Sequence, residues 1–168
     1  MKYLLSDIAK IVGGELRGLD VEVWEVATDS RSTVATDGVL FAAIDGKNHD
    51  GHDYVERMVS RGVRAFIVER DMELKNKGCG IVKVSSTLDA LQRLAEYHRA
   101  QYKGRVVAIT GSNGKTIVKE WASRSMPDTV RSFASPKSYN PQLGVALSLL
   151  MLEGSEEVAF IEAGISEV

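Results

Sequence analysis

Three things are scarce in this sequence of 168 residues: cysteine, long hydrophobic runs and an excess of positive charge. The single cysteine, Cys79, cannot close an internal disulfide, which agrees with a reducing compartment. No apolar run approaches the roughly 20 residues that a membrane-spanning helix needs, and Asp7 interrupts the N-terminal segment before the core of a signal peptide builds up. We therefore expect a cytoplasmic protein that does not enter a membrane.

The charge balance argues against a polyanionic partner. The chain has 21 Lys and Arg against 23 Asp and Glu, a formal net charge of -2, and no run of basic residues. Because binding to a nucleic-acid backbone rests on clustered positive charge, we expect no nucleic-acid partner. The length is enough to bury one good core or two small ones.

The first part of the chain reads as a small α/β domain. Ser6 is expected to cap a short helix that stops at Gly13, and Trp24 and Trp121 are expected to be packing residues. Periodicity predicts strands at 21–29, 39–44, 64–69 and 81–84, and helices at 52–62 and from 85 to about 102.

From Arg105 onward strands and helices alternate, with strands at 106–110, 129–134 and 158–164 and helices at 117–126 and 141–151. This alternation is typical of a parallel, doubly wound sheet, so we place a domain boundary near Gly104 and predict domains 1–103 and 104–168. With only three strands in the second sheet, apolar positions such as Val107, Ile109 and Phe160 are expected to be poorly protected.

The stretch VVAITGSNGKTIVKEW, residues 106–121, combines a strand, a glycine-rich turn and the start of a helix. Backbone N–H groups of such a turn and the positive helix end form an anion site, which predicts a phosphate cradle made of Gly111, Ser112, Asn113, Gly114, Lys115 and Thr116. In this interpretation Lys115 reaches the β- and γ-phosphates of a nucleotide and Thr116 holds Mg²⁺. The general motif has glycine where this chain has Ile109.

Glu162 comes at the carboxyl end of the last expected strand, which should lie beside the strand before the phosphate cradle. Ligands bind beyond the carboxyl ends of such strands, so this carboxylate is placed to complete a Mg²⁺ shell with Thr116. A second candidate metal site, His49 and His52 with their neighbouring aspartates, has no further His or Cys nearby, which favours a helix start instead.

Five stretches resemble segments of the Mur ligase family, which builds the peptide of peptidoglycan precursors: TGSNGKT (110–116), TDSR (28–31), DGHDY (50–54), KSYNPQLGVALSLL (137–150) and IEAGIS (161–166). The resemblance covers nearly the whole chain. Within the family, GKTIVKEW and EAGIS are most similar to the enzymes that add D-alanyl-D-alanine to UDP-N-acetylmuramoyl-tripeptide, a form of which is fused to an alanine racemase.

The resemblance implies a three-domain ATP-dependent ligase that works through an acyl phosphate, of which this chain would hold the UDP-binding domain and the opening of the ATP-binding domain. It assigns Lys115, Asn140 and Glu162 to catalysis, 111–116 to ATP, Thr116 and Glu162 to Mg²⁺, and Ser30 and Arg31 to the UDP-sugar. The complete enzyme is expected to be a monomer. This chain alone is expected to bind without turnover and to self-associate.

Alternatives within and outside the family stay open. The ligase that adds the third residue of the same precursor shares the DSR and GHD segments, and a folylpolyglutamate-type or cyanophycin-type ligase shares the phosphate loop. A non-catalytic module that holds a UDP-sugar peptide and an unrelated P-loop regulator are further possibilities. Binding of a uridine nucleotide separates the Mur ligases from the other ATP-dependent ligases.

Overall fold

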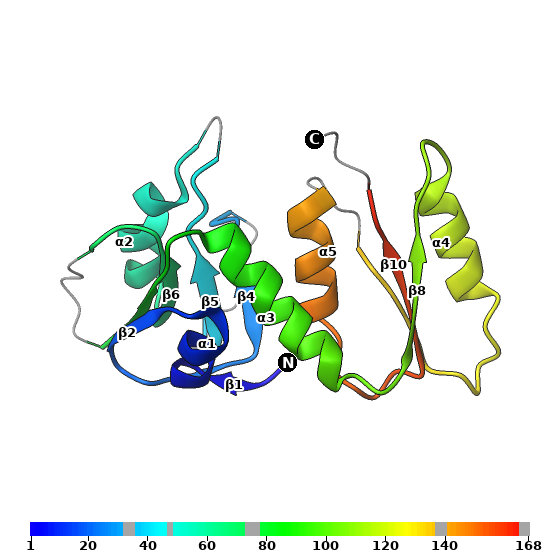
Figure 1. The fold of residues 1–168 in the computed structure, drawn as a ribbon, viewed down its shortest axis with the longest axis horizontal. Coiled ribbons are helices and arrows are strands. Elements are labelled where there is room, and N and C mark those ends of the chain that lie inside the picture. The colour runs from blue at the N-terminus through cyan, green and yellow to red at the C-terminus, as the bar shows by residue number, and fades with distance from the viewer. Residues whose placement is uncertain (32–35, 47–48, 73–77, 137–140, 165–168) are drawn as a thin grey trace. The chain divides into compact units, whose positions relative to one another are not determined.

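The computed structural model describes residues 1–31, 36–46, 49–72, 78–136 and 141–164 (Figure 1). The chain divides into two compact units, Met1–Leu94 and Ala95–Val168. Helix α3, Thr87–Gln101, contributes its first part to one unit and its last part to the other. The division into functional domains after Lys103 remains a prediction.

The first unit is built on a mixed five-stranded sheet of order β2-β7-β6-β5-β4. Strands β4 to β7 run parallel, and β2 is antiparallel to β7 at the edge. The elements of this unit are β1 (Tyr3–Leu4), α1 (Leu5–Val12), β2 (Glu15–Gly18), β3 (Glu22–Val23), β4 (Glu25–Ala27), β5 (Val39–Ala42), the 3-10 helix η1 (Gly51–Tyr54), α2 (Val55–Ser60), β6 (Ala65–Val68), β7 (Gly80–Lys83) and the start of α3.

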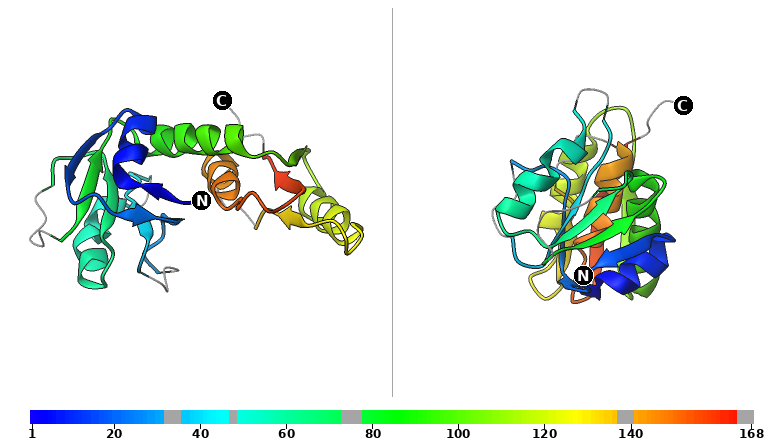
Figure 2. Two further views of the ribbon diagram at one scale, coloured as in Figure 1. Left: turned by 90° about the horizontal axis from the view of Figure 1, so that it is seen from below. Right: turned by 90° about the vertical axis from the view of Figure 1, so that its left-hand side faces the viewer.

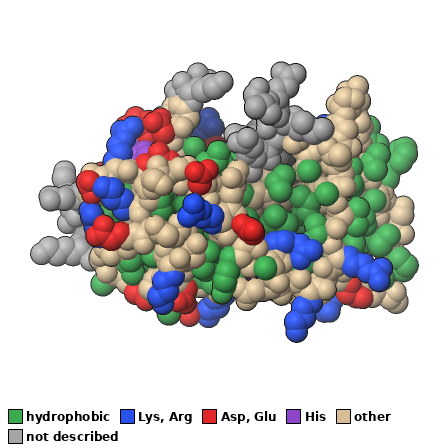
Figure 3. All heavy atoms as spheres, viewed as in Figure 1, with side chains coloured by type: hydrophobic (Ala, Val, Ile, Leu, Met, Phe, Trp, Pro, Cys, Tyr) green, Lys and Arg blue, Asp and Glu red, His purple; other side chains and the backbone are tan. Residues whose placement is uncertain are grey.

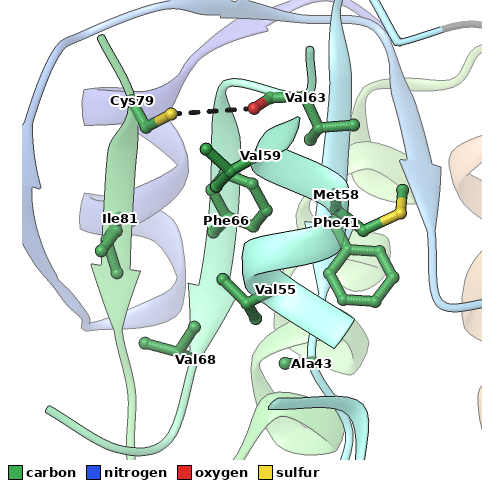
Figure 4. Packing of buried hydrophobic residues seen from close by; sticks show 10 residues of the cluster. All are labelled: Phe41, Ala43, Val55, Met58, Val59, Val63, Phe66, Val68, Cys79 and Ile81. Atoms are coloured by element: carbon green, nitrogen blue, oxygen red, sulfur yellow. Dashed lines mark hydrogen bonds between the residues drawn. The ribbon is translucent and has the colours of Figure 1, made fainter. Parts of the chain in front are cut away.

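Helices cover both faces of this sheet, with α2 on one side and α1 and the start of α3 on the other (Figure 2). On the α2 side, Phe41 and Phe66 meet edge to face with ring centroids 6.4 Å apart, and Val55 and Met58 of α2 are fully buried against them (Figure 4). Side chains of successive strand residues alternate between the two faces of the sheet. Because helices cover both faces, all four residues of β5 and of β6 are buried. This explains why they read as continuous apolar runs in the sequence.

Two local predictions for this unit were wrong. Helix α1 begins after Leu4, without a side-chain cap, and the Ser6 backbone N–H donates instead to Asp20 Oδ1 at 2.8 Å. The expected strand 21–29 divides at Trp24, whose side chain lies against Gly38 and stays 43% exposed. The helix end was predicted correctly, because Gly13 takes the left-handed conformation at φ 72°.

The second unit has a three-stranded parallel sheet of order β8-β10-β9, which confirms the predicted parallel arrangement. Its elements are β8 (Arg105–Ile109), α4 (Lys115–Arg124), β9 (Ser132–Ala134), α5 (Pro141–Leu150) and β10 (Val158–Glu162). Because β10 lies between the other two strands, Phe160 is buried, and the prediction of poor protection was wrong for it. Val107 on the edge strand β8 is 41% exposed, as expected.

Helix α4 presents an apolar surface to solvent. Ile117, Val118 and Trp121 are 56%, 52% and 69% exposed, so the expected packing of Trp121 is wrong. Hydrophobic side chains gather over the part of this unit formed by β8 and α4 (Figure 3). The buried residue of α4 is a lysine, Lys119, with 1% of its surface exposed. Among the described residues, no helix combines the length and apolar character that crossing a membrane requires.

Candidate functional site

The glycine-rich turn lies between the end of β8 and the first residue of α4. Gly111 and Gly114 have φ values of 141° and 78°, a region that L side chains rarely adopt, so glycine is needed for the backbone conformation itself. No heavy atom lies within 4 Å of a Cβ built on Gly114, so this part of the turn is open. Because α4 begins at Lys115 with no acidic residue in its first turn, its unpaired N–H groups create a positive end at the turn.

Two side chains of the first turn of α4 have defined partners. The Lys115 ammonium donates to the carbonyl oxygen of Gly111 at 2.6 Å, so the lysine folds back over the glycine turn. The Thr116 hydroxyl donates to Glu162 Oε2 at 2.9 Å. Residues 46 positions apart in the sequence therefore meet beside the turn.

The strand register explains this meeting. Glu162 on β10 is paired with Ile109 on β8, and the next residue, Ala163, donates its N–H to the Ile109 carbonyl at 2.9 Å. Parallel strands bring their carboxyl ends to one edge, where α4 begins. A hydroxyl and a carboxylate are oxygen ligands of the kind that Mg²⁺ prefers, so the pair Thr116 and Glu162 fits a cation of this type. Asn140, the third predicted catalytic residue, lies outside the described residues.

Lys119 and Ser135 extend this arrangement and were missed from the sequence. The buried Lys119 ammonium donates to the Ser135 carbonyl oxygen, while the Ser135 hydroxyl accepts the Glu162 N–H at 3.0 Å. Together with the Thr116 hydrogen bond, these contacts form a closed circuit from α4 to the ends of β9 and β10 and back to α4. The only feature of the sequence that could have pointed to Lys119 as part of this site is its spacing, since it follows Lys115 by about one helical turn.

The first unit contains a second candidate site, a cavity of about 280 Å³ lined by Thr28, Asp29, Ser30, Arg31, Ile44, His49, Gly51 and Tyr54. Ser30 and Arg31, predicted to contact a UDP-sugar, therefore lie in one pocket together with Tyr54 and His49, which sequence reasoning did not assign. Ser30 is 5% exposed, and its carbonyl accepts a hydrogen bond from the Arg61 guanidinium at 2.5 Å.

Arg31 is held in a fork with Asp29. Its Nε donates to Asp29 Oδ1 at 3.0 Å, its Nη2 to Oδ2 at 2.9 Å, and its backbone N–H to Oδ1 at 2.9 Å. These hydrogen bonds hold the pKa of the Asp29 carboxyl below its ordinary value of 3.8. The turn thus presents a guanidinium of fixed direction at an exposed edge of the pocket.

The two histidines near this pocket have different surroundings. His49 is exposed, whereas His52 is buried and both of its ring nitrogens contact protein groups, Asp50 Oδ1 at 2.6 Å and the Glu69 backbone N–H at 2.9 Å. In the part of the chain that the structure describes, no group of three or more metal-binding side chains is found. Asp50 caps η1 by accepting the His52 backbone N–H, so this segment forms a helix start.

Comparison with known proteins finds similarity to one family of ligases. A family model described as "Mur ligase family, catalytic domain" matches residues 23–99, which include the pocket residues of the first unit. The UDP-N-acetylmuramoyl-tripeptide–D-alanyl-D-alanine ligase of Escherichia coli is 34% identical over 95% of this chain, and that of Bacillus subtilis is 31% identical over 99%. The chain spans only 34% and 36% of the lengths of these two relatives.

Solved structures of MurF enzymes are also similar to this chain. A crystal structure of MurF from Acinetobacter baumannii matches 98% of this chain with a TM-score of 0.87 at 28% identity, and the match covers 36% of that protein. MurF from Thermotoga maritima, solved in complex with ADP, matches 85% of this chain with a TM-score of 0.71 at 31% identity, covering 32% of that protein. These matches include both units and confirm the predicted α/β fold.

Proposed function

Since this chain belongs to the Mur ligase family, we propose that it supplies the uridine-nucleotide and phosphate sites of a ligase that adds D-alanyl-D-alanine to UDP-N-acetylmuramoyl-tripeptide. The observation that carries this proposal is the 34% identity to the E. coli ligase over 95% of the chain, a span that holds both candidate sites. The cytoplasmic location expected from the sequence stays part of the proposal.

The proposed reaction needs positioned charge more than a protein nucleophile. The terminal carboxylate of the tripeptide attacks the γ-phosphorus of ATP, and ADP leaves as the acyl phosphate forms. The amine of D-alanyl-D-alanine then attacks the acyl carbon, inorganic phosphate leaves, and the amine loses a proton to give the peptide bond. Each step accumulates negative charge on phosphate oxygens, which fixed cations and N–H groups stabilise.

The glycine turn of the second unit supports the proposed binding of the ATP phosphates. The open turn at Gly111 and Gly114 lets backbone N–H groups approach phosphate oxygens, and Lys115 already lies over this turn. Thr116 and Glu162 would hold Mg²⁺, whose chemistry when bound is to neutralise charge on the β- and γ-phosphates. The Lys119–Ser135 contact would keep the Glu162 backbone in register with α4.

The pocket of the first unit supports the proposed binding of the UDP-linked precursor. Arg31 is a guanidinium held in one direction at the rim of a cavity of about 280 Å³, a size near the lower end for small-molecule pockets. Asp29 engages Nε and Nη2 of this guanidinium, and the outer N–H groups on Nη1 and Nη2 are donors of fixed direction that suit phosphate oxygens of UDP. The buried Ser30 and Tyr54 supply polar and aromatic walls. We expect this chain alone to bind uridine nucleotides weakly and to perform no ligation, since it corresponds to 34% of the E. coli relative.

Calorimetric titration of the 168-residue chain with UDP and with ATP plus Mg²⁺ tests the proposal. We expect a saturable signal with UDP that Arg31→Ala abolishes, and a weaker signal or none with ATP. Arg17→Ala is the matched control, because Arg17 is also an exposed arginine paired with carboxylates, and it lies on β2 outside the pocket lining. Strong ATP binding without UDP binding would contradict the proposal, and so would ADP formation that depends on D-alanyl-D-alanine.

A further inference from the structure

We propose that His52 is a positioning residue for the uridine pocket, held as a neutral imidazole that braces the pocket wall against strand β6. This inference rests on the proposed function of the pocket. His52 belongs to the single turn of η1, Gly51–Tyr54, of which Gly51 and Tyr54 line the cavity. The His52 side chain is 3% exposed and is not part of the lining, so it acts through the turn that carries it.

The contacts of the ring fix its tautomer. The backbone N–H of Glu69 lies 2.9 Å from His52 Nε2 and can only donate, so Nε2 must offer a lone pair. A neutral imidazole then carries its hydrogen on Nδ1, which lies 2.6 Å from Asp50 Oδ1 and donates to it. Each nitrogen of the ring therefore has one fixed role.

Asp50 holds the other side of the turn. Its Oδ1 accepts both the Nδ1–H and the backbone N–H of His52, the latter at 2.9 Å, and its carboxylate is paired with Arg70. The Asp50 backbone forms a bridge with Asp45, and Gly51 donates its N–H to the Ile44 carbonyl at 2.8 Å. The segment that forms the pocket wall is thus fixed at its start by side-chain contacts as well as by backbone ones.

The brace continues from the pocket into the interior of the first unit. Glu69 directly follows β6, and while its N–H bonds to His52, its carboxylate Oε1 accepts the backbone N–H of Thr87 at 2.6 Å. Thr87 is fully buried at the first residue of α3. The pocket turn, the end of β6 and the start of α3 are therefore joined by consecutive hydrogen bonds through His52 and Glu69.

Two substitutions separate the roles of the ring nitrogens. In His52→Gln the side-chain carbonyl oxygen can take the place of Nε2 and accept the Glu69 N–H. In His52→Asn the amide nitrogen can take the place of Nδ1 and donate to Asp50, but the Glu69 N–H loses its acceptor. Because an unpaired buried donor is costly, we expect His52→Asn to weaken UDP binding about tenfold or more, and His52→Gln to restore most of it.

Amide hydrogen exchange and nitrogen NMR provide readouts that do not depend on the ligand. The Glu69 amide should exchange slowly in the wild type and in His52→Gln, and at least tenfold faster in His52→Asn. A long-range ¹⁵N–¹H spectrum of the wild-type chain should show His52 with its hydrogen on Nδ1. His98→Gln is the matched control, a half-buried histidine with a carbonyl partner in the second unit, and should leave UDP binding unchanged.

The outcomes of this experiment distinguish the two claims. If the wild-type chain binds no UDP, the proposed function of the pocket fails, and the positioning role fails with it. If UDP binds and both His52 variants bind it as tightly as the wild type, the inference alone is overturned. A hydrogen on Nε2 in the wild-type spectrum would also overturn it, even if a variant fails to fold.

Discussion

Replacing the buried Lys119 by methionine should change the free energy of unfolding of the second unit by no more than about 1 kcal/mol, because the interactions of the ammonium roughly offset its burial. Lys119 is 1% exposed, donates to the Ser135 carbonyl and lies 3.4 Å from Glu120 Oε1. Taking an ammonium out of water costs several kcal/mol. The charged hydrogen bond to the Ser135 carbonyl stabilises the folded state by about 1.5–3 kcal/mol, and the ion pair with the partly exposed Glu120 contributes less than about 1 kcal/mol.

Methionine keeps the volume and removes both the burial cost of the ammonium and the hydrogen bond to the Ser135 carbonyl, two contributions that roughly cancel. Lys119→Ala should cost about 2–4 kcal/mol more than Lys119→Met, because it also leaves a cavity. Urea unfolding monitored by Trp121 fluorescence in a Trp24→Phe background reads the second unit alone. Lys10→Met, at an exposed lysine of α1, should stay within about 0.5 kcal/mol of the wild type. A cost above about 3 kcal/mol for Lys119→Met, equal to that of alanine, would refute this reasoning.

Three further predictions concern other sites. Burial lowers the pKa of His98 below 6.5, although the hydrogen bond between its Nε2 and the Leu152 carbonyl acts in the opposite direction. Neutral His98 therefore contributes its full share to the free energy of unfolding above pH 6.5, and this contribution is lost as the pH falls through the lowered pKa. His98→Gln should flatten the pH dependence of thermal unfolding below pH 6.5, and an unchanged profile would contradict this. Lys115→Ala in a complete enzyme that contains this chain should reduce turnover by about 10²- to 10³-fold while UDP binding persists, whereas turnover within about threefold of the wild type would refute the role of Lys115. The apolar surface of α4 and β8 should make this chain self-associate and exchange amide hydrogens faster after Gly104 than before it. Trp121→Glu should reduce association in sedimentation experiments, and a strictly monomeric wild type with equal protection on both sides would contradict the prediction.

Most of the fold could be predicted from periodicity, because buried strands such as β5 and β6 are continuous apolar runs and because α1 ends at a glycine. Strands β1 and β2 were missed: β1 has two residues, and β2 is an exposed edge strand whose residues Glu15 and Arg17 give no apolar pattern. The protection of Phe160 depends on strand order, which the sequence does not encode locally.

The candidate sites were predictable where a local motif positions them. The glycine turn and the nearness of Thr116 and Glu162 follow from the motif and from the rule that parallel strands end at one edge. Lys119 was missed because α4 inverts the usual pattern, with its lysine buried and Ile117 and Trp121 exposed. The brace at His52 was missed because its partner, Glu69, is 17 positions away and bonds through its backbone.

The position of β10 between β8 and β9 determines when, in a growing chain, these two strands can pair. Strands β8 and β9 leave the ribosome first, but each pairs with β10, whose residues Val158–Glu162 are synthesised after both of them. The first unit, by contrast, has all five strands of its sheet translated once Lys83 has been added. During translation the phosphate-loop strand β8 therefore stays unpaired until β10 is made, and the contact between Thr116 and Glu162 forms only after residue 162 has been added. A nascent chain halted before Val158 exposes an unpaired apolar strand, which is the kind of segment that chaperones bind and that aggregates when they do not.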